Sequence, residues 1–170
     1  AYIRADNIDR ELAQLMVETG MSYFEIGITS GSQELVRKMQ LAYNLKTVLE
    51  NCRMLVEAGF RNHVSVNYSF NVFDETPNTI KQTVAYHREL ENIFGKGLVD
   101  PAIFFIGLQP HTLLEKYALE NNILKPSYNP MSMMPWTARK LLWNPGPLGK
   151  KLGEVCLEAF DNKDDEFGKT

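Results

Sequence analysis

The stretch HVSVNYSFNVF at residues 63–73 decides the fold, because apolar and polar residues alternate along its whole length. A period of two residues is that of a β-strand, whose successive side chains point to opposite faces of a sheet. One face carries only polar or titratable groups: His63, Ser65, Asn67, Ser69 and Asn71. Five such groups are costly to bury between two helix layers. The pattern therefore favours a barrel whose interior is wet, or else an edge strand exposed to water.

The segments on either side of this strand alternate in type. We predict further strands at residues 2–5, 22–29 and 102–108, with Pro101 leading into the last of them. Between and after them we predict helices at about 9–18, 32–39, 44–58, 76–95 and 112–121, the first and third capped by Asp9 and Asn44. Alternating strands and helices indicate an α/β protein with parallel strands and right-handed crossovers.

The composition changes after Leu124. Five prolines and the run MSMM occupy residues 126–147, and apolar residues at helical spacing follow from Leu148 to Phe160. We therefore predict two parts, a strand-and-helix domain at 1–125 and a Pro- and Met-rich wrap with a final helix at 126–170.

The charge and the cysteines limit the functions that the chain can have. Its 18 Lys and Arg face 21 Asp and Glu, which gives a net charge of −3 and no basic patch for nucleic acid. Cys52 and Cys156 are far apart and lack CxxC spacing, as is usual in a reducing compartment. No apolar run is long enough to cross a bilayer. We expect a cytoplasmic protein that takes a small-molecule substrate and binds neither nucleic acid nor membrane.

The strand at 22–29 also places a charge where a barrel interior would be. Glu25 shares its face with Gly27 and Thr29, so we expect it either to bind a ligand or to form an ion pair with Lys or Arg. We expect at least one of Asn67, Ser69 and Asn71 to contact a ligand. A phosphate-binding barrel is disfavoured, since no Gly-rich loop leads into a helix N-terminus.

Four segments, in order, resemble those of the radical SAM enzymes. They are YIRADNIDRELAQLMVETG (2–20), GMSYFEIGITSGSQELVRKM (20–39), AGFRNHVSVNYSFNVFDETPNTIKQT (58–83) and IGLQPHTLLEKYALENNIL (106–124). The likeness is greatest to the subfamily with a cobalamin-binding domain. It implies a partial, TIM-like (βα) barrel with about four of its parallel strands here, helices outside, and S-adenosylmethionine (SAM) with an iron–sulfur cluster in the lumen.

The resemblance also implies roles for individual residues. Glu25, Thr29, Ser30, Asn67, Ser69 and Asn71 would bind the cofactor, and His111 and Gln109 would face the substrate. The CxxxCxxC cluster ligands of the family are absent from this sequence, so we expect no metal ligand in it. Because the chain starts without Met and enters a strand at once, we expect it to be a piece of a radical SAM oxidoreductase or methyltransferase. We expect that piece to be inactive alone and to self-associate through exposed strand edges, while cobalamin would be a further cofactor of the parent.

Departures from the family pattern support an alternative. Thr29 stands where the family has a glutamate, and Asn71 stands where it has a glycine. These changes would also fit a non-catalytic barrel that binds a small polar ligand or serves as an interaction scaffold.

Overall fold

The computed structural model describes residues 1–70, 72, 74–105, 110–120 and 122. Its strands β1 (Tyr2–Ile3), β2 (Tyr23–Thr29), β3 (His63–Phe70) and β4 (Val99–Phe105) form one sheet. All neighbouring pairs are parallel, in the order β1-β2-β3-β4. Parallel strands in chain order, each followed by a helix, are the arrangement of a partial (βα) barrel. The predicted fold class is thereby confirmed.

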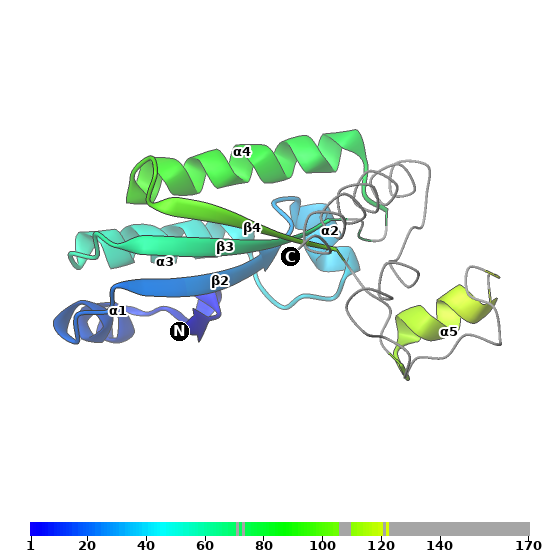
Figure 1. The fold of residues 1–170 in the computed structure, drawn as a ribbon, viewed down its shortest axis with the longest axis horizontal. Helices are drawn as coiled ribbons and strands as arrows, with labels where there is room; N and C mark the ends of the chain where they lie inside the picture. Colours follow the sequence, from blue (N-terminus) through cyan, green and yellow to red (C-terminus); the bar gives the residue numbers. More distant parts are fainter. Residues whose placement is uncertain (71, 73, 106–109, 121, 123–170) are drawn as a thin grey trace, which may run out of the picture.

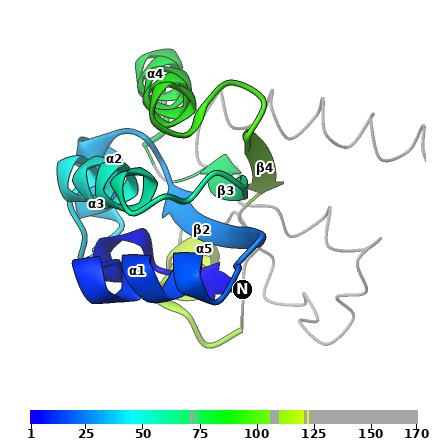
Figure 2. The ribbon, with the colours of Figure 1, turned by 90° about the vertical axis from the view of Figure 1, so that its left-hand side faces the viewer.

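The helices follow the strands in sequence, and those between two strands cover one face of the sheet in space. After the short 3-10 helix η1 (Ala5–Asn7) come α1 (Arg10–Glu18), α2 (Gln33–Lys38), α3 (Leu45–Glu57), α4 (Pro77–Phe94) and α5 (Leu113–Glu120). Figure 2 shows α1, α3 and α4 on the same side of the sheet. Helix α5 lies apart from them, beyond the ends towards which the strands point (Figure 1).

Side-chain caps confirm the predicted starts of α1, α3 and α4. The carboxylate of Asp9 accepts a hydrogen bond from the Leu12 backbone N–H at 2.8 Å, and Asn44 Oδ1 accepts one from that of Lys46 at 2.8 Å. Thr76 and Thr79 cap α4 reciprocally, with Pro77 as its first residue. Such caps satisfy N–H groups that have no partner within the helix.

The core lies between the sheet and the covering helices. Phe24 of β2 packs edge-to-face on Phe60 and on Phe94, at ring-centroid distances of 5.2 and 6.5 Å. Both contacts have the geometry that aromatic pairs prefer. Cys52 of α3 is fully buried in the same cluster, so it acts as a small core residue.

Strand β3 lies between β2 and β4, so the edge-strand explanation of its polar face is wrong. Its apolar residues Val64, Val66 and Tyr68 are buried under the helices. Its polar residues share the opposite face with Glu25 and Gly27 of β2. We call this side, which carries Glu25, Gly27, Ser65, Asn67 and Ser69, the polar face.

Two sequence predictions differ from the structure or lie outside it. Strand β4 begins at Val99, so Pro101 lies within the strand and not before it. Among the described strands β4 is an edge, where a residue without an N–H is tolerated. The predicted domain at 126–170, with its Pro- and Met-rich wrap and last helix, lies outside the described residues.

Candidate functional site

The register of the sheet aligns the residues of the polar face from three strands in two rows. Glu25 lies opposite Ser65, which lies opposite Asp100. One step towards the carboxyl ends, Gly27 lies opposite Asn67, which lies opposite Ala102. Neighbouring strands are about 4.8 Å apart, so these side chains are within reach of one another.

Glu25 is held by neutral groups. Its Oε1 accepts a hydrogen bond from the Tyr23 hydroxyl at 3.1 Å, and its Oε2 accepts one from Asn67 Nδ2 at 3.3 Å. In the part of the chain that the structure describes, no Lys or Arg makes an ion pair with this carboxylate. Of the two predictions for Glu25, the ion pair is therefore not found among these residues.

One polar atom of the Asn67 side chain has no hydrogen-bond partner among the described residues. Its Nδ2 faces the Glu25 carboxylate, which fixes the orientation of the amide because the oxygen would be repelled there. Its Oδ1 is buried and has no hydrogen-bond partner among the described residues. An unsatisfied buried acceptor costs about 1–3 kcal/mol. A hydrogen-bond donor from a ligand would remove this cost.

The carboxyl end of β2 has an unusual backbone. Thr29 has a φ of 58°, and the Ser30 N–H donates to the Ile28 carbonyl at 2.6 Å across it. The Tyr43 hydroxyl donates to the same carbonyl. Burial raises the pKa of Tyr43 to about 12, so this hydroxyl keeps its proton at neutral pH. The turn places Thr29 at the end of the sheet where parallel α/β proteins bind ligands.

The Ser30 side chain turns to the helix side. It is 1% exposed, its Oγ lies 3.4 Å from Thr83 Oγ1 of α4, and it accepts a hydrogen bond from the Ser32 N–H at 3.1 Å. The structure therefore does not bring the Ser30 hydroxyl together with Glu25 and Asn67 on the polar face.

The remaining predicted site residues are spread out. Ser69 is half-buried on the polar face, opposite Phe104. His111 is exposed just before α5, and its backbone N–H donates to Glu115 Oε2 at 2.7 Å. Asn71 and Gln109 lie outside the described residues.

Sequence reasoning missed two residues of this face. The Tyr2 hydroxyl lies over Gly27, where a Cβ would be 2.1 Å from the Tyr2 oxygen. Asp100 adds a second carboxylate, 3.4 Å from His63 Nδ1 at the amino end of β3. The alternation of side chains along each strand could have placed Tyr2 and Asp100 on this face. Only the register between the strands shows which residues they lie next to.

The described residues do not form a metal centre. Among them, no three His, Cys, Asp or Glu side chains gather at one point. Burial raises the pKa of the Cys52 thiol to about 12, so it is not the thiolate that a metal requires.

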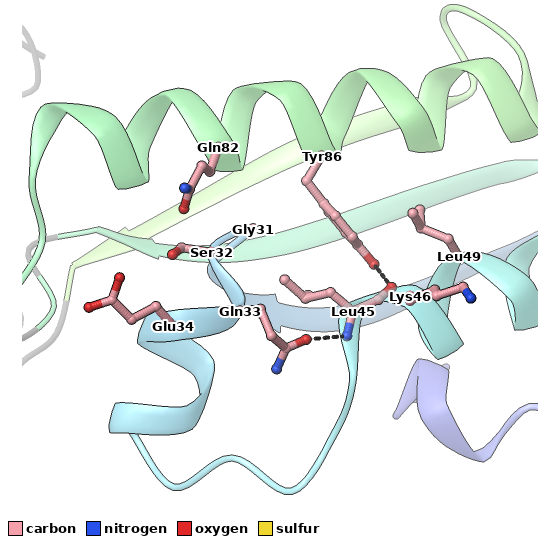
Figure 3. Close-up of a pocket in the computed structure, with 9 residues that line it drawn as sticks. All are labelled: Gly31, Ser32, Gln33, Glu34, Leu45, Lys46, Leu49, Gln82 and Tyr86. Atoms are coloured by element: carbon pink, nitrogen blue, oxygen red, sulfur yellow. Dashed lines mark hydrogen bonds between the residues drawn. The ribbon is translucent and has the colours of Figure 1, made fainter.

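Two hollows lie on the helix side, away from the polar face. A cavity of about 420 Å³ is bordered by α2, α3 and α4 (Figure 3), and one of about 250 Å³ lies between α4 and β4.

Of the helices that the structure describes, none combines the length and apolar character needed to cross a membrane.

Comparison with known proteins gives one match. The family model of the Radical SAM superfamily matches residues 2–87, which hold β1 to β3 and the first part of α4. A search of curated proteins finds no match to this chain. Because the family match covers half of the sequence, the chain belongs to the radical SAM superfamily.

Proposed function

We propose that this chain supplies SAM-binding strands to a radical SAM oxidoreductase or methyltransferase. The family implies SAM and usually a [4Fe–4S] cluster. The polar face would hold SAM through Glu25, Asn67 and Ser69, and Thr29 would contact it at the carboxyl end of β2. The observation that carries this proposal is the buried and unpartnered Oδ1 of Asn67, next to the Glu25 carboxylate.

The charge of the polar face suits SAM. The four described strands contain no Lys or Arg, while Glu25 and Asp100 add two carboxylates to this face. SAM carries a positive sulfonium and an ammonium group, and its ribose hydroxyls donate hydrogen bonds. An acidic face rich in acceptors therefore fits this cofactor better than it fits a phosphate.

The residues of this chain do not fit an iron–sulfur cluster. Such clusters are usually held by several Cys thiolates. The whole sequence has only two cysteines, and Cys52 is buried in the core with its pKa raised by burial. We therefore propose that the cluster ligands of the active enzyme lie in another segment or subunit, and that this chain is inactive alone.

Each residue of the site would have a defined role. Bound SAM supplies the carbon–sulfur bond whose reductive cleavage starts radical chemistry. Glu25 would attract the cation, and Asn67 Oδ1 would orient a donor group. We propose His111 and Gln109 as substrate contacts, on the strength of their position after β4.

The test compares two ligands that differ in charge. We would measure the binding of SAM and of S-adenosylhomocysteine, which lacks the sulfonium charge, by isothermal titration calorimetry. The attraction between two opposite charges about 4 Å apart is about 1 kcal/mol in water and larger near a protein surface, so we expect SAM to bind about tenfold more tightly. Glu25→Gln should remove most of that difference, because the amide keeps the shape of the side chain but not its charge.

Glu50→Gln is the matched control, since Glu50 is on α3 and pairs with Lys46 outside the polar face. It should leave both affinities unchanged. Equal affinity of the unmodified chain for the two ligands would contradict the role of Glu25. The absence of binding to either ligand at millimolar concentration would refute the proposed function.

The alternative function is a non-catalytic barrel that binds a small polar ligand. The observation that favours it is Thr29, a neutral residue at the family's glutamate position. SAM binding without deoxyadenosine formation, in the protein together with the segment or subunit that holds a reduced cluster, would support it. The use of cobalamin stays a prediction.

A further inference from the structure

The turn between β2 and α2 is held in a strained conformation. A β-branched residue rarely adopts a positive φ, and Thr29 has a φ of 58° at the centre of a three-residue turn closed by the Ser30 N–H. Such turns persist only where their surroundings hold them. The Tyr43 hydroxyl holds the turn at the Ile28 carbonyl, and further groups that hold it come from α4.

One buried hydroxyl on α4 is the centre of a directed hydrogen-bond chain. The Thr83 hydroxyl donates to the Thr79 carbonyl at 3.1 Å, which uses its only proton. Its oxygen accepts the Gly31 N–H at 3.0 Å. In the 3.4 Å contact with Ser30, the serine must therefore be the donor. Ser30 Oγ in turn accepts the Ser32 N–H at 3.1 Å.

Close packing fixes the turn at the same point of α4. A Cβ on Gly31 would be 2.5 Å from Thr83 Cα and 2.7 Å from Tyr86 Cβ. Figure 3 shows Gly31 and Ser32 next to α4, which carries Gln82 and Tyr86. Thr83 itself is 4% exposed and lies on the helix side of the sheet, so it does not contact a ligand on the polar face.

We propose that Thr83 is a positioning residue of the SAM site. Its hydroxyl holds Ser30 and Gly31 against α4, and this keeps Thr29 in the left-handed conformation that presents it at the carboxyl end of β2. This inference rests on the proposed function, because it takes SAM as the ligand. It adds a residue from α4 that acts on the cofactor only through the turn.

The size of the effect follows from the population of the competent turn. Without the Thr83 hydroxyl, the Gly31 N–H loses its acceptor and the Ser30 hydroxyl loses its partner. If the strained turn is then populated about a tenth of the time, the affinity for SAM falls about tenfold. The loss should be equal for S-adenosylhomocysteine, because the turn carries no charge.

The test uses three variants of the chain. Thr83→Val keeps the shape and removes the hydroxyl, while Thr83→Ser keeps the hydroxyl. Tyr86→Phe is the matched control, because it also removes one buried hydroxyl of α4, whose partner is the Leu45 carbonyl at 3.0 Å and not the turn. The measurements are calorimetric affinities for both ligands, the free energy of unfolding, and amide hydrogen exchange of Gly31.

We expect Thr83→Val to lower the affinity for both ligands about tenfold and to speed amide exchange at Gly31. Thr83→Ser should keep both properties as they are in the unmodified chain, and Tyr86→Phe should change neither the affinities nor the exchange rate. Unchanged affinities in Thr83→Val, with the unmodified chain binding SAM, would overturn the positioning role and leave the proposed function intact. Failure of the unmodified chain to bind either ligand would overturn both. A loss of affinity in Tyr86→Phe equal to that in Thr83→Val would also overturn it, because the effect would then follow stability alone.

Discussion

Replacing Gly31 with alanine should destabilise the fold more than the same replacement at Gly20 or Gly27. The new Cβ would meet Thr83 Cα at 2.5 Å, Tyr86 Cβ at 2.7 Å and the Gln82 carbonyl oxygen at 3.0 Å. These are backbone and Cβ atoms of α4, so none of them can rotate away from the new methyl group. Overpacking of this kind costs about 1–3 kcal/mol, and loosening the bond from the Gly31 N–H to Thr83 adds about 1 kcal/mol. We expect a loss of about 2–4 kcal/mol.

The other two glycines separate packing from backbone conformation. Gly20 has a φ of 69° but no atom within 4 Å of its ideal Cβ, so Gly20→Ala should cost only about 1 kcal/mol of backbone strain. At Gly27 the Cβ would meet the tip of the exposed Tyr2 side chain, which can swing away, so the cost should stay below about 0.5 kcal/mol. Urea denaturation followed by circular dichroism measures all three. If Gly31→Ala costs no more than Gly20→Ala, the packing argument is refuted.

Three more predictions concern the core and the sheet edge. Cys52→Ser should lower the free energy of unfolding by about 1–3 kcal/mol in urea denaturation, because it buries a hydroxyl among apolar groups, and a neutral result would contradict the dry core. Burial raises the pKa of Cys52 from 9.0 to about 12 and that of Tyr43 from 10.0 to about 12, so both groups favour the folded state below pH 9. The free energy of unfolding should therefore fall as the pH rises from 9 towards 12, and Cys52→Ala should make this fall with pH less steep. Ile103 and Phe104 of β4 are each more than half exposed at an edge of the described sheet, so we expect light scattering to show self-association, which Ile103→Lys should weaken.

The sequence predicted the order of elements because local signals set it. The period of two in residues 63–70, and the caps at Asp9, Asn44 and Thr76, depend on neighbours within a few positions. Pro101 misled the prediction, because whether a strand can contain proline depends on its place in the sheet.

The candidate site could be predicted only in part from the sequence. The alternation of side chains along each strand predicted that Glu25 and Asn67 share one face, and in the structure the two side chains form a hydrogen bond. The resemblance implied that Ser30 belongs to the same site, yet after the positive φ at Thr29 the Ser30 side chain turns towards α4. Sequence periodicity does not reveal a single left-handed residue. Nor does it show that Thr83, 53 positions further on, receives the Ser30 hydroxyl.

The left-handed threonine also bears on how this protein would respond to laboratory evolution. A library selected for heat resistance alone should enrich glycine or asparagine at position 29, because these residues adopt a positive φ with less strain. A library selected for ligand capture should keep threonine there. A position at which the two selections favour different residues would be one where the chain gives up thermal stability in favour of ligand binding.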